Sequence, residues 1–446
     1  MFDSPLPLFE PNFSLSRRDF LKLGGVFTLS LLASGLPGWA GKTTAPLKSN
    51  QKLIVVFLRG AADALSLVVP YGDPLYYSSR PNISIPRPGQ TGGCLDLNGY
   101  FGLNPNLSAL YPYWQKQQLR LILNSGSPDN TRSHFDAQDY MESGTPGVKS
   151  TESGWLNRLL QVLPETHSPT RAMNIGPTVP RILKGPVAVA NLDVQSQNPN
   201  RRMPLDQPRL ANAFESLYGA GANASPNQRA LSNAFEEGMA ARHSIEKSLS
   251  MENTLNGGLN GGLNEGSEAE KTAANRGATP TGKFGQFGKK ISQLLRNDPS
   301  IQVVFLPLGG WDTHVNQGSV QGAFAQQASA LGNGLSDLMQ GLSSSSDPTL
   351  AERTTIVVMS EFGRTVKENG NRGTDHGHGN VMMVMSGQQN SRQLLGNWTG
   401  LESSLLFEGR DLPVNTDFRQ VFDGILSHRF GLTSEQLRTV FPSRGL

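Results

Sequence analysis

The chain has 446 residues, 37% of them hydrophobic, which is enough for one large soluble domain, or two smaller ones, with a buried core. Its 39 Lys and Arg residues nearly balance its 36 Asp and Glu residues and form no basic block, so we expect no nucleic-acid partner. Cys94 is the only cysteine, which excludes an intrachain disulfide. No base neighbours it in the sequence, so we expect a partly buried spectator.

The N-terminus predicts an export signal. The segment 16–22 (SRRDFLK) precedes an uncharged apolar run over 23–36 and then small residues near Ala40. This layout is that of a cleaved signal peptide, and the pair Arg17 and Arg18 resembles the twin-arginine (Tat) signal of bacteria. The apolar run is shorter than the roughly 20 residues that span a membrane, so we prefer a cleaved signal over 1–40 to a membrane anchor. That resemblance implies the Tat translocation machinery as a partner, a periplasmic or secreted location, and no stable membrane span after cleavage.

Apolar runs alternate with helical patterns along the rest of the chain. Continuous apolar stretches predict buried strands at Lys52–Leu58, 119–123, 187–192, 301–306, 355–359 and 381–385. Apolar residues at helical spacing predict helices over 323–342 and 418–432. This alternation predicts an α/β fold in which a mostly parallel central sheet is flanked by helices on both faces.

The composition and the apolar pattern of the chain change over 195–285. Residues 204–251 read as largely helical, and 255–266 (LNGGLNGGLNEG) form a small Asn/Gly-rich repeat. Such a repeat cannot form a packed core, so we expect a flexible surface loop. We therefore interpret 195–285 as a helical and low-complexity insertion within a single domain over 41–446.

Polar residues gather next to the predicted strands. Ligands of open α/β sheets bind beyond the carboxyl ends of the strands, so residues at these positions are the candidate site. They are Asp63 after the first strand, 130–136 (NTRSHFD) after the second, Asp312 and His314 after the fourth, Glu361 and Arg364 after the fifth, and Asp375, His376 and His378 before the last.

These residues favour a metal site. The two-residue spacing of Asp312 and His314 lets both side chains turn to one ion, and the glycine-framed loop 373–380 (GTDHGHGN) can present both of its imidazoles to one side. Carboxylate and imidazole together suit a first-row divalent metal such as Zn or Mn better than calcium or magnesium. The alternatives are a capping Asp beside a surface His, and a surface loop that binds metal only adventitiously.

The segment 130–136 supplies candidate catalytic groups. A metal-activated hydroxyl of Ser133 or Thr131 is a workable nucleophile, with His134 beside it, and Ser133 can also cap a helix over 135–142. The guanidinium of Arg364 could bind phosphate or sulfate through two N–H groups. A local ion pair explains an arginine at this position nearly as well.

The motifs together resemble the DUF1501 family, a group of secreted bacterial proteins of undetermined activity. The resemblance rests on the Tat signal and on 57–63 (FLRGAAD), 131–138 (TRSHFDAQ), 310–314 (GWDTH), 360–365 (SEFGRT) and 373–377 (GTDHG), and it runs over nearly the whole chain. That family in turn resembles the alkaline phosphatase/sulfatase superfamily, whose metal ligands lie at the ends of parallel strands. This resemblance implies an alkaline-phosphatase-like fold.

The same resemblance implies roles for individual residues. Asp63 matches a first-strand metal ligand, and Ser133 or Thr131 matches the nucleophile region. Asp312 and His314 match a pair of ligands of one metal ion. Glu361 matches the position of an Asp ligand of a second metal ion, and His376 or His378 matches the histidine ligand that comes late in the chain. No Cys-x-Pro-Ser-Arg segment is present, which excludes the standard sulfatase mechanism.

We therefore expect an exported metal-dependent hydrolase of phosphate or sulfate esters, acting on a small-molecule substrate. In this interpretation Asp312, His314 and His378 hold the metal, and Arg364 steadies the charge of the oxyanion. The alternative is an exported binding or assembly protein with an envelope partner, which keeps the fold and catalyses nothing.

Overall fold

The structure is a computed structural model that describes residues 50–164, 168, 170–192, 240, 244–245, 274–344 and 347–442. The predicted export signal lies outside these residues, as does most of the predicted insertion, including its Asn/Gly repeat. Among the described residues, no helix is both long enough and apolar enough to cross a membrane.

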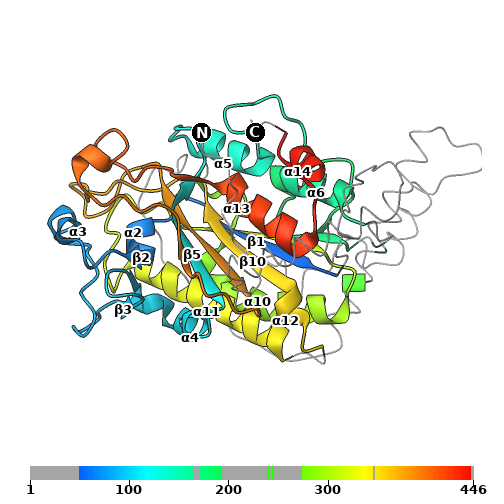
Figure 1. Cartoon of the computed structure of the whole chain (residues 1–446), viewed down its shortest axis with the longest axis horizontal. Coiled ribbons are helices and arrows are strands. Elements are labelled where there is room, and N and C mark those ends of the chain that lie inside the picture. The colour runs from blue at the N-terminus through cyan, green and yellow to red at the C-terminus, as the bar shows by residue number, and fades with distance from the viewer. Residues whose placement is uncertain are drawn as a thin grey trace, which may run out of the picture.

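A large mixed sheet forms the centre of the molecule (Figure 1). Its strands run in the order β12-β5-β11-β10-β1-β9-β6-β7, with β13 added beside β5 and β8 beside β9. Their bounds are β1 (Lys52–Leu58), β5 (Leu119–Gly126), β6 (Ala172–Ile175), β7 (Ala190–Leu192), β8 (Thr279–Pro280), β9 (Val303–Gly309), β10 (Thr354–Ser360), β11 (Asn380–Ser386), β12 (Leu394–Leu395) and β13 (Thr416–Asp417). All six predicted strands are present, which confirms the fold class.

The sheet is parallel except at β11. Strand β1 pairs in parallel with both neighbours, so that Leu53 lies opposite Thr355 of β10 and Val303 of β9. Strand β11 runs antiparallel to β10 and β5. Its first residues therefore lie at the edge where β10 and β5 end, which brings the histidine-containing loop before it to the carboxyl edge of the parallel strands.

Helices cover both faces of the sheet, as Figure 1 shows for α10 and α11 on one side and α6, α13 and α14 on the other. Strand β1 is buried on both faces, because Ile54 and Val56 belong to one apolar core and Leu53 and Val55 to the other. The helices are α2 (Ala64–Leu67), α3 (Pro74–Ser79), α4 (Tyr111–Gln115), α5 (His134–Ser143), α6 (Trp155–Val162), α10 (Phe284–Asn297), α11 (Ala323–Ser343), α12 (Leu350–Arg353), α13 (Phe418–Ile425) and α14 (Ser434–Val440). A separate small sheet has the order β2 (Val68–Val69), β4 (Gly102–Leu103), β3 (Leu95–Asp96).

The two predicted helices are present. Helix α11 begins at the predicted residue and ends one residue later, and its apolar stripe, including Phe324 and Leu335, is fully buried. Helix α13 continues as a π-helical turn over Leu426–Phe430. Cys94 is buried, and burial raises the pKa of its thiol to about 11, which suits a spectator.

Candidate metal centre

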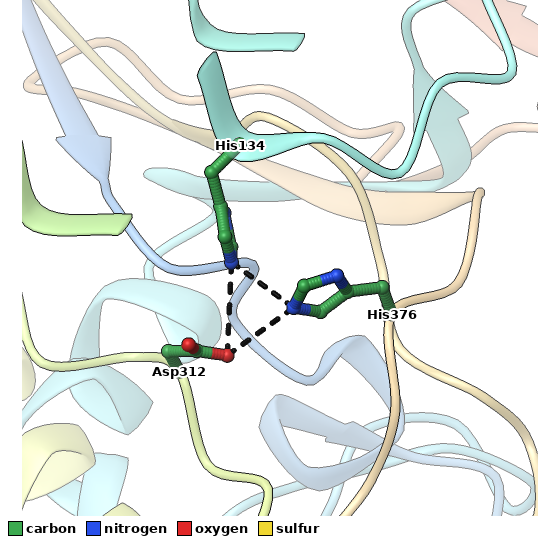
Figure 2. Close-up of side chains that lie close together, drawn as sticks. All are labelled: His134, Asp312 and His376. Atoms are coloured by element: carbon green, nitrogen blue, oxygen red, sulfur yellow. Dashed lines mark hydrogen bonds and ion pairs between the residues drawn. The ribbon is translucent and has the colours of Figure 1, made fainter. Parts of the chain in front are cut away.

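Four chain segments meet at the carboxyl edge of the sheet. His134 is the first residue of α5, which follows β5, and Asp312 lies in the loop after β9. His376 approaches β11 and forms an isolated antiparallel bridge with Arg364, which follows β10. Gly377 permits this approach, because a Cβ there would lie 2.5 Å from the carbonyl carbon of Arg364. In Figure 2 the side chains of His134, Asp312 and His376 point toward one another.

Three donor atoms of this cluster form a triangle of metal-site dimensions. His134 Nε2 lies 3.1 Å from His376 Nε2. Asp312 Oδ1 lies 3.4 Å from His376 Nε2 and 3.7 Å from His134 Nε2. Ligand bonds of about 2.0–2.2 Å place the atoms of a tetrahedral site roughly 3.3–3.5 Å apart. We call these three residues the ligand triangle, since their donor atoms lie close enough together that they could hold one metal ion.

His314 borders one edge of the ligand triangle. Its Nε2 lies 3.0 Å from Asp312 Oδ1 and 2.9 Å from His376 Nε2. The side chain of His314 is 33% exposed, against 5% for His134, so it stands on the solvent side of the cluster. The predicted pairing of Asp312 with His314 is thus present in the structure, and His314 is placed to serve as an additional ligand.

The Nδ1 atoms of the three histidines face acceptors outside the cluster. His376 Nδ1 lies 3.0 Å from the carbonyl oxygen of Arg132, which can only accept, so this nitrogen carries the hydrogen. His134 Nδ1 lies 2.8 Å from Glu361 Oε1, and His314 Nδ1 lies 3.4 Å from Asp375 Oδ1. Each imidazole can therefore turn an Nε2 lone pair inward. Lone pairs this close repel unless a cation or a proton lies between them.

The charges of the cluster are balanced internally. Burial would raise the pKa of Asp312, but the neighbouring histidines and the charge of Arg364 hold it well below its usual range. Burial opposes protonation of His134, yet Asp312 and Glu361 outweigh it and raise the pKa to about 9. Burial also lowers the pKa of His376. In the metal-free protein a proton on His134 therefore occupies the place of a cation.

Glu361 supports His134 from outside the ligand triangle. It is fully buried, and its Oε1 accepts hydrogen bonds from Gly60 N and Gln138 Nε2, both at 2.9 Å, besides facing His134. Burial would raise the pKa of Glu361, but His134 and Gln138 lower it to about 2. The sequence predicts Glu361 as a metal ligand; in the structure its carboxylate contacts His134 Nδ1 and lies outside the ligand triangle. Asp375 stands in the same relation to His314.

The guanidinium of Arg364 is held mainly by carbonyl oxygens of the main chain. Its guanidinium donates to the carbonyl oxygens of Gly60 at 2.6 Å, Ala61 at 2.7 Å and Thr374 at 2.9 Å. It also contacts Asp312 and the carbonyl of Trp311. The fork predicted to hold an oxyanion thus mainly holds together the loops that carry the centre, and its Nη1 also lies 3.5 Å from His314 Nε2.

Two other predicted ligands lie apart from the ligand triangle. Asp63 is fully buried and pairs with Arg80 through both oxygens, while Ser66 and Gln317 also donate to it. His378 packs on Phe407, with ring centroids 4.4 Å apart, so the two imidazoles of the 373–380 loop do not face one side as expected. Of the predicted set Asp312, His314 and His378, the structure brings Asp312 and His314 together and leaves His378 apart, while His134 and His376 join Asp312 in the ligand triangle.

The two candidate nucleophiles have local roles. Ser133 caps α5 as predicted, since its Oγ accepts from Asp136 N, and Thr131 Oγ1 accepts from Ser133 N at 3.2 Å. Within the described part of the chain, neither hydroxyl hydrogen-bonds to a member of the cluster. Because both contacts use the hydroxyl oxygen as acceptor, each O–H remains available to donate.

The fold and the centre together define an α/β protein with a His–Asp–His ligand set at the carboxyl edge of its sheet. Residues 105–441 match the profile of the family described as "Protein of unknown function (DUF1501)", so the chain belongs to this family. No curated protein matches the sequence.

Several solved structures are similar to this one. An alkaline phosphatase from the Antarctic bacterium TAB5 has 12% identity and a TM-score of 0.32, with 86% of this chain and 99% of that chain covered. Ps i-CgsB, solved in complex with k-i-k-neocarrahexaose, has 11% identity and a TM-score of 0.34, covering 87% and 74%. The integral membrane lipooligosaccharide phosphoethanolamine transferase A from Neisseria meningitidis has 10% identity and a TM-score of 0.32, covering 83% and 55%.

Proposed function

We propose that this protein is an exported metal-dependent hydrolase of phosphate or sulfate esters. The observation that carries the proposal is the ligand triangle, whose histidines turn their Nε2 atoms inward because their Nδ1 atoms face Glu361 and the Arg132 carbonyl. Donor atoms this close together favour a bound cation, whose place a proton on His134 takes when the metal is absent.

The residues present fit a divalent metal. His134, Asp312 and His376 would hold it, with His314 beside them, and this donor set suits Zn or Mn. When bound, such an ion supplies Lewis-acid polarisation of an ester oxygen. Glu361 and the Arg132 carbonyl orient the imidazoles, and Arg364 fixes Asp312, so the protein would not need to rearrange to receive the ion.

Ser133 and Thr131 are the candidate nucleophiles. Ser133 directly precedes His134, Thr131 lies three residues before it, and each keeps its O–H free to donate. An attacking hydroxyl would displace the alcohol of the ester and take up the phosphate or sulfate group, which water would then release.

The test is an ester panel on metal-replete mature protein. We expect Ser133→Ala to reduce turnover and to leave bound metal unchanged, with Thr131→Ala as its matched control; the reverse pattern would assign the nucleophile to Thr131. If both variants keep wild-type turnover, neither hydroxyl is the nucleophile. If the wild-type protein binds metal and hydrolyses no ester in the panel, the hydrolase proposal fails.

The second candidate is an exported binding or assembly protein that uses the same fold without catalysis. Two observations favour it: most N–H groups of Arg364 donate to main-chain carbonyls, and within the described residues neither candidate nucleophile hydrogen-bonds to the cluster. A metal-replete protein that is inert toward every ester but is retained by an envelope partner would support this candidate.

Export is proposed from sequence, because the signal lies outside the described residues. Changing Arg17 and Arg18 to Lys keeps the positive charge but removes the guanidinium pair that marks Tat signals. We expect full-length precursor to remain in the cytoplasm. Periplasmic accumulation at the wild-type level would refute the Tat assignment.

A further inference from the structure

A second polar cluster lies beside the ligand triangle. Arg132 precedes His134 by two residues, and its carbonyl oxygen accepts from His376 Nδ1. Its guanidinium donates to the buried carboxylate of Asp411, with Nη2 and Oδ2 2.7 Å apart. The backbone of Arg132 thus orients a candidate metal ligand, while its side chain belongs to the neighbouring cluster.

Asp411 holds a second guanidinium next to the first. Arg410 donates to Asp411 from Nε and Nη2, both at 3.0 Å. Its Nη2 also donates to the carbonyl oxygen of His376 at 2.9 Å. One wholly buried carboxylate therefore fixes two arginines on the His376 side of the centre. Fixed guanidiniums are suited to recognising the oxygens of a phosphate or sulfate group.

The hydrogen-bonding capacity of Arg132 is not filled. Both of its ion pairs run through Nη2, and among the described residues its buried Nε has no hydrogen-bond partner. A buried N–H without an acceptor is costly, so such an atom marks a place where an acceptor belongs. The guanidinium also lies 6.0 Å from the ring centroid of Phe407, the ring on which His378 packs.

Glu408 occupies the exposed side of Arg132. Its Oε2 lies 2.6 Å from Arg132 Nη2, although the Glu408 side chain is 51% exposed. It sits in a tight turn closed by reciprocal hydrogen bonds between Phe407 and Asp411, at 2.8 and 3.0 Å, and has a left-handed φ of 52°. An exposed ion pair of this kind is weak and screened by salt, so another anion can displace it.

We propose that Arg132 and Arg410, held by Asp411, form a subsite for the oxyanion of a phosphate or sulfate group, and that Glu408 occupies it until that anion displaces it. This inference rests on the proposed ester hydrolysis, because it gives the charged end of that substrate its binding residues.

The test is the affinity of the full-length mature protein for inorganic phosphate and, separately, inorganic sulfate, measured by calorimetry with and without saturating Zn²⁺. We expect Arg132→Gln to weaken binding by at least tenfold and Arg132→Lys by less, because Lys keeps the charge and loses the fork. Glu408→Gln removes the competing charge and should strengthen binding several-fold. Glu402→Gln, an equal charge change at another exposed glutamate, is the control and should change nothing.

Unchanged affinity in Arg132→Gln, or affinity in Glu408→Gln no higher than in Glu402→Gln, would overturn the inference. Glu408 is exposed, so its variant remains informative even if Arg132→Gln folds poorly. The anion that binds more tightly identifies the class of ester. Arg132-dependent anion binding by a protein that hydrolyses no ester would refute the proposed function and leave the subsite standing.

Discussion

Glu361 and His134 are joined by a buried contact of 2.8 Å between Oε1 and Nδ1. The contact links the residue after β10 to the first residue of α5, and Gln138, one turn further along α5, donates to the same oxygen. Glu361 therefore contacts two residues of one helix, and the Nε2 atom of His134 faces Asp312 and His376.

Replacing this carboxylate should loosen the metal rather than abolish the fold. Acceptors behind metal-bound histidines typically contribute about 10–100-fold in metal affinity. We expect Glu361→Gln to weaken Zn²⁺ binding within that range, measured by competition with a chromophoric chelator. Asp375→Asn is the matched control, since Asp375 is 56% exposed and lies 3.4 Å from His314. A loss no greater than that of the control would contradict the role of Glu361.

The buried pair of Asp63 and Arg80 should behave as a structural element. Removing one partner of a buried ion pair leaves an unpaired charge, which costs roughly 3–5 kcal/mol of unfolding free energy. We expect Asp63→Asn to lower stability on that scale in urea unfolding and to leave the bound metal at the wild-type amount. Loss of metal without loss of stability would instead restore Asp63 as a ligand.

The protonation of His134 predicts how the metal-free protein responds to pH. Its folded-state pKa of about 9 lies above the unfolded value of about 6.5, so its stabilising contribution is complete below pH 6.5 and is lost as pH rises through 9. The difference corresponds to about 3 kcal/mol. Urea unfolding of chelator-treated protein at pH 6 and pH 9.5 measures it.

The control for this pH prediction is His134→Gln, which lacks the titrating group. We expect the loss of stability between the two pH values to be smaller in the variant. Saturating Zn²⁺ should also reduce the loss in the wild type, because the cation replaces the proton. Equal losses in variant and wild type would show that His134 does not titrate in this way.

Most of the fold follows from the sequence because buried strands are long apolar runs. Strand β1 begins and ends at the predicted residues, and the apolar patterns of α11 and β10 are equally clear in the sequence. Strand β6 was not predicted, since it has only four residues and carries the polar Asn174. An apolar run has no direction, so nothing in 381–385 indicated that β11 is antiparallel.

The site was predicted as a region but not as a ligand set. The candidate loops could be located because each adjoins a strand. The spacing of His376 and His378 could not decide which imidazole faces Asp312, because that depends on the bridge between His376 and Arg364 and on the ring of Phe407. His134 appeared only as a candidate catalytic residue, and its position opposite Asp312 depends on where α5 begins.

The central claim is that His134, Asp312 and His376 hold one divalent cation. The most direct measurement is the metal content, per protein molecule, of the mature protein purified from the periplasm without chelators, compared with that of His376→Ala and His378→Ala. We predict at least one Zn or Mn ion in the wild type and in His378→Ala, and a loss of that ion in His376→Ala. A wild-type protein without a stoichiometric ion, or one that loses its ion in His378→Ala and keeps it in His376→Ala, would contradict this account.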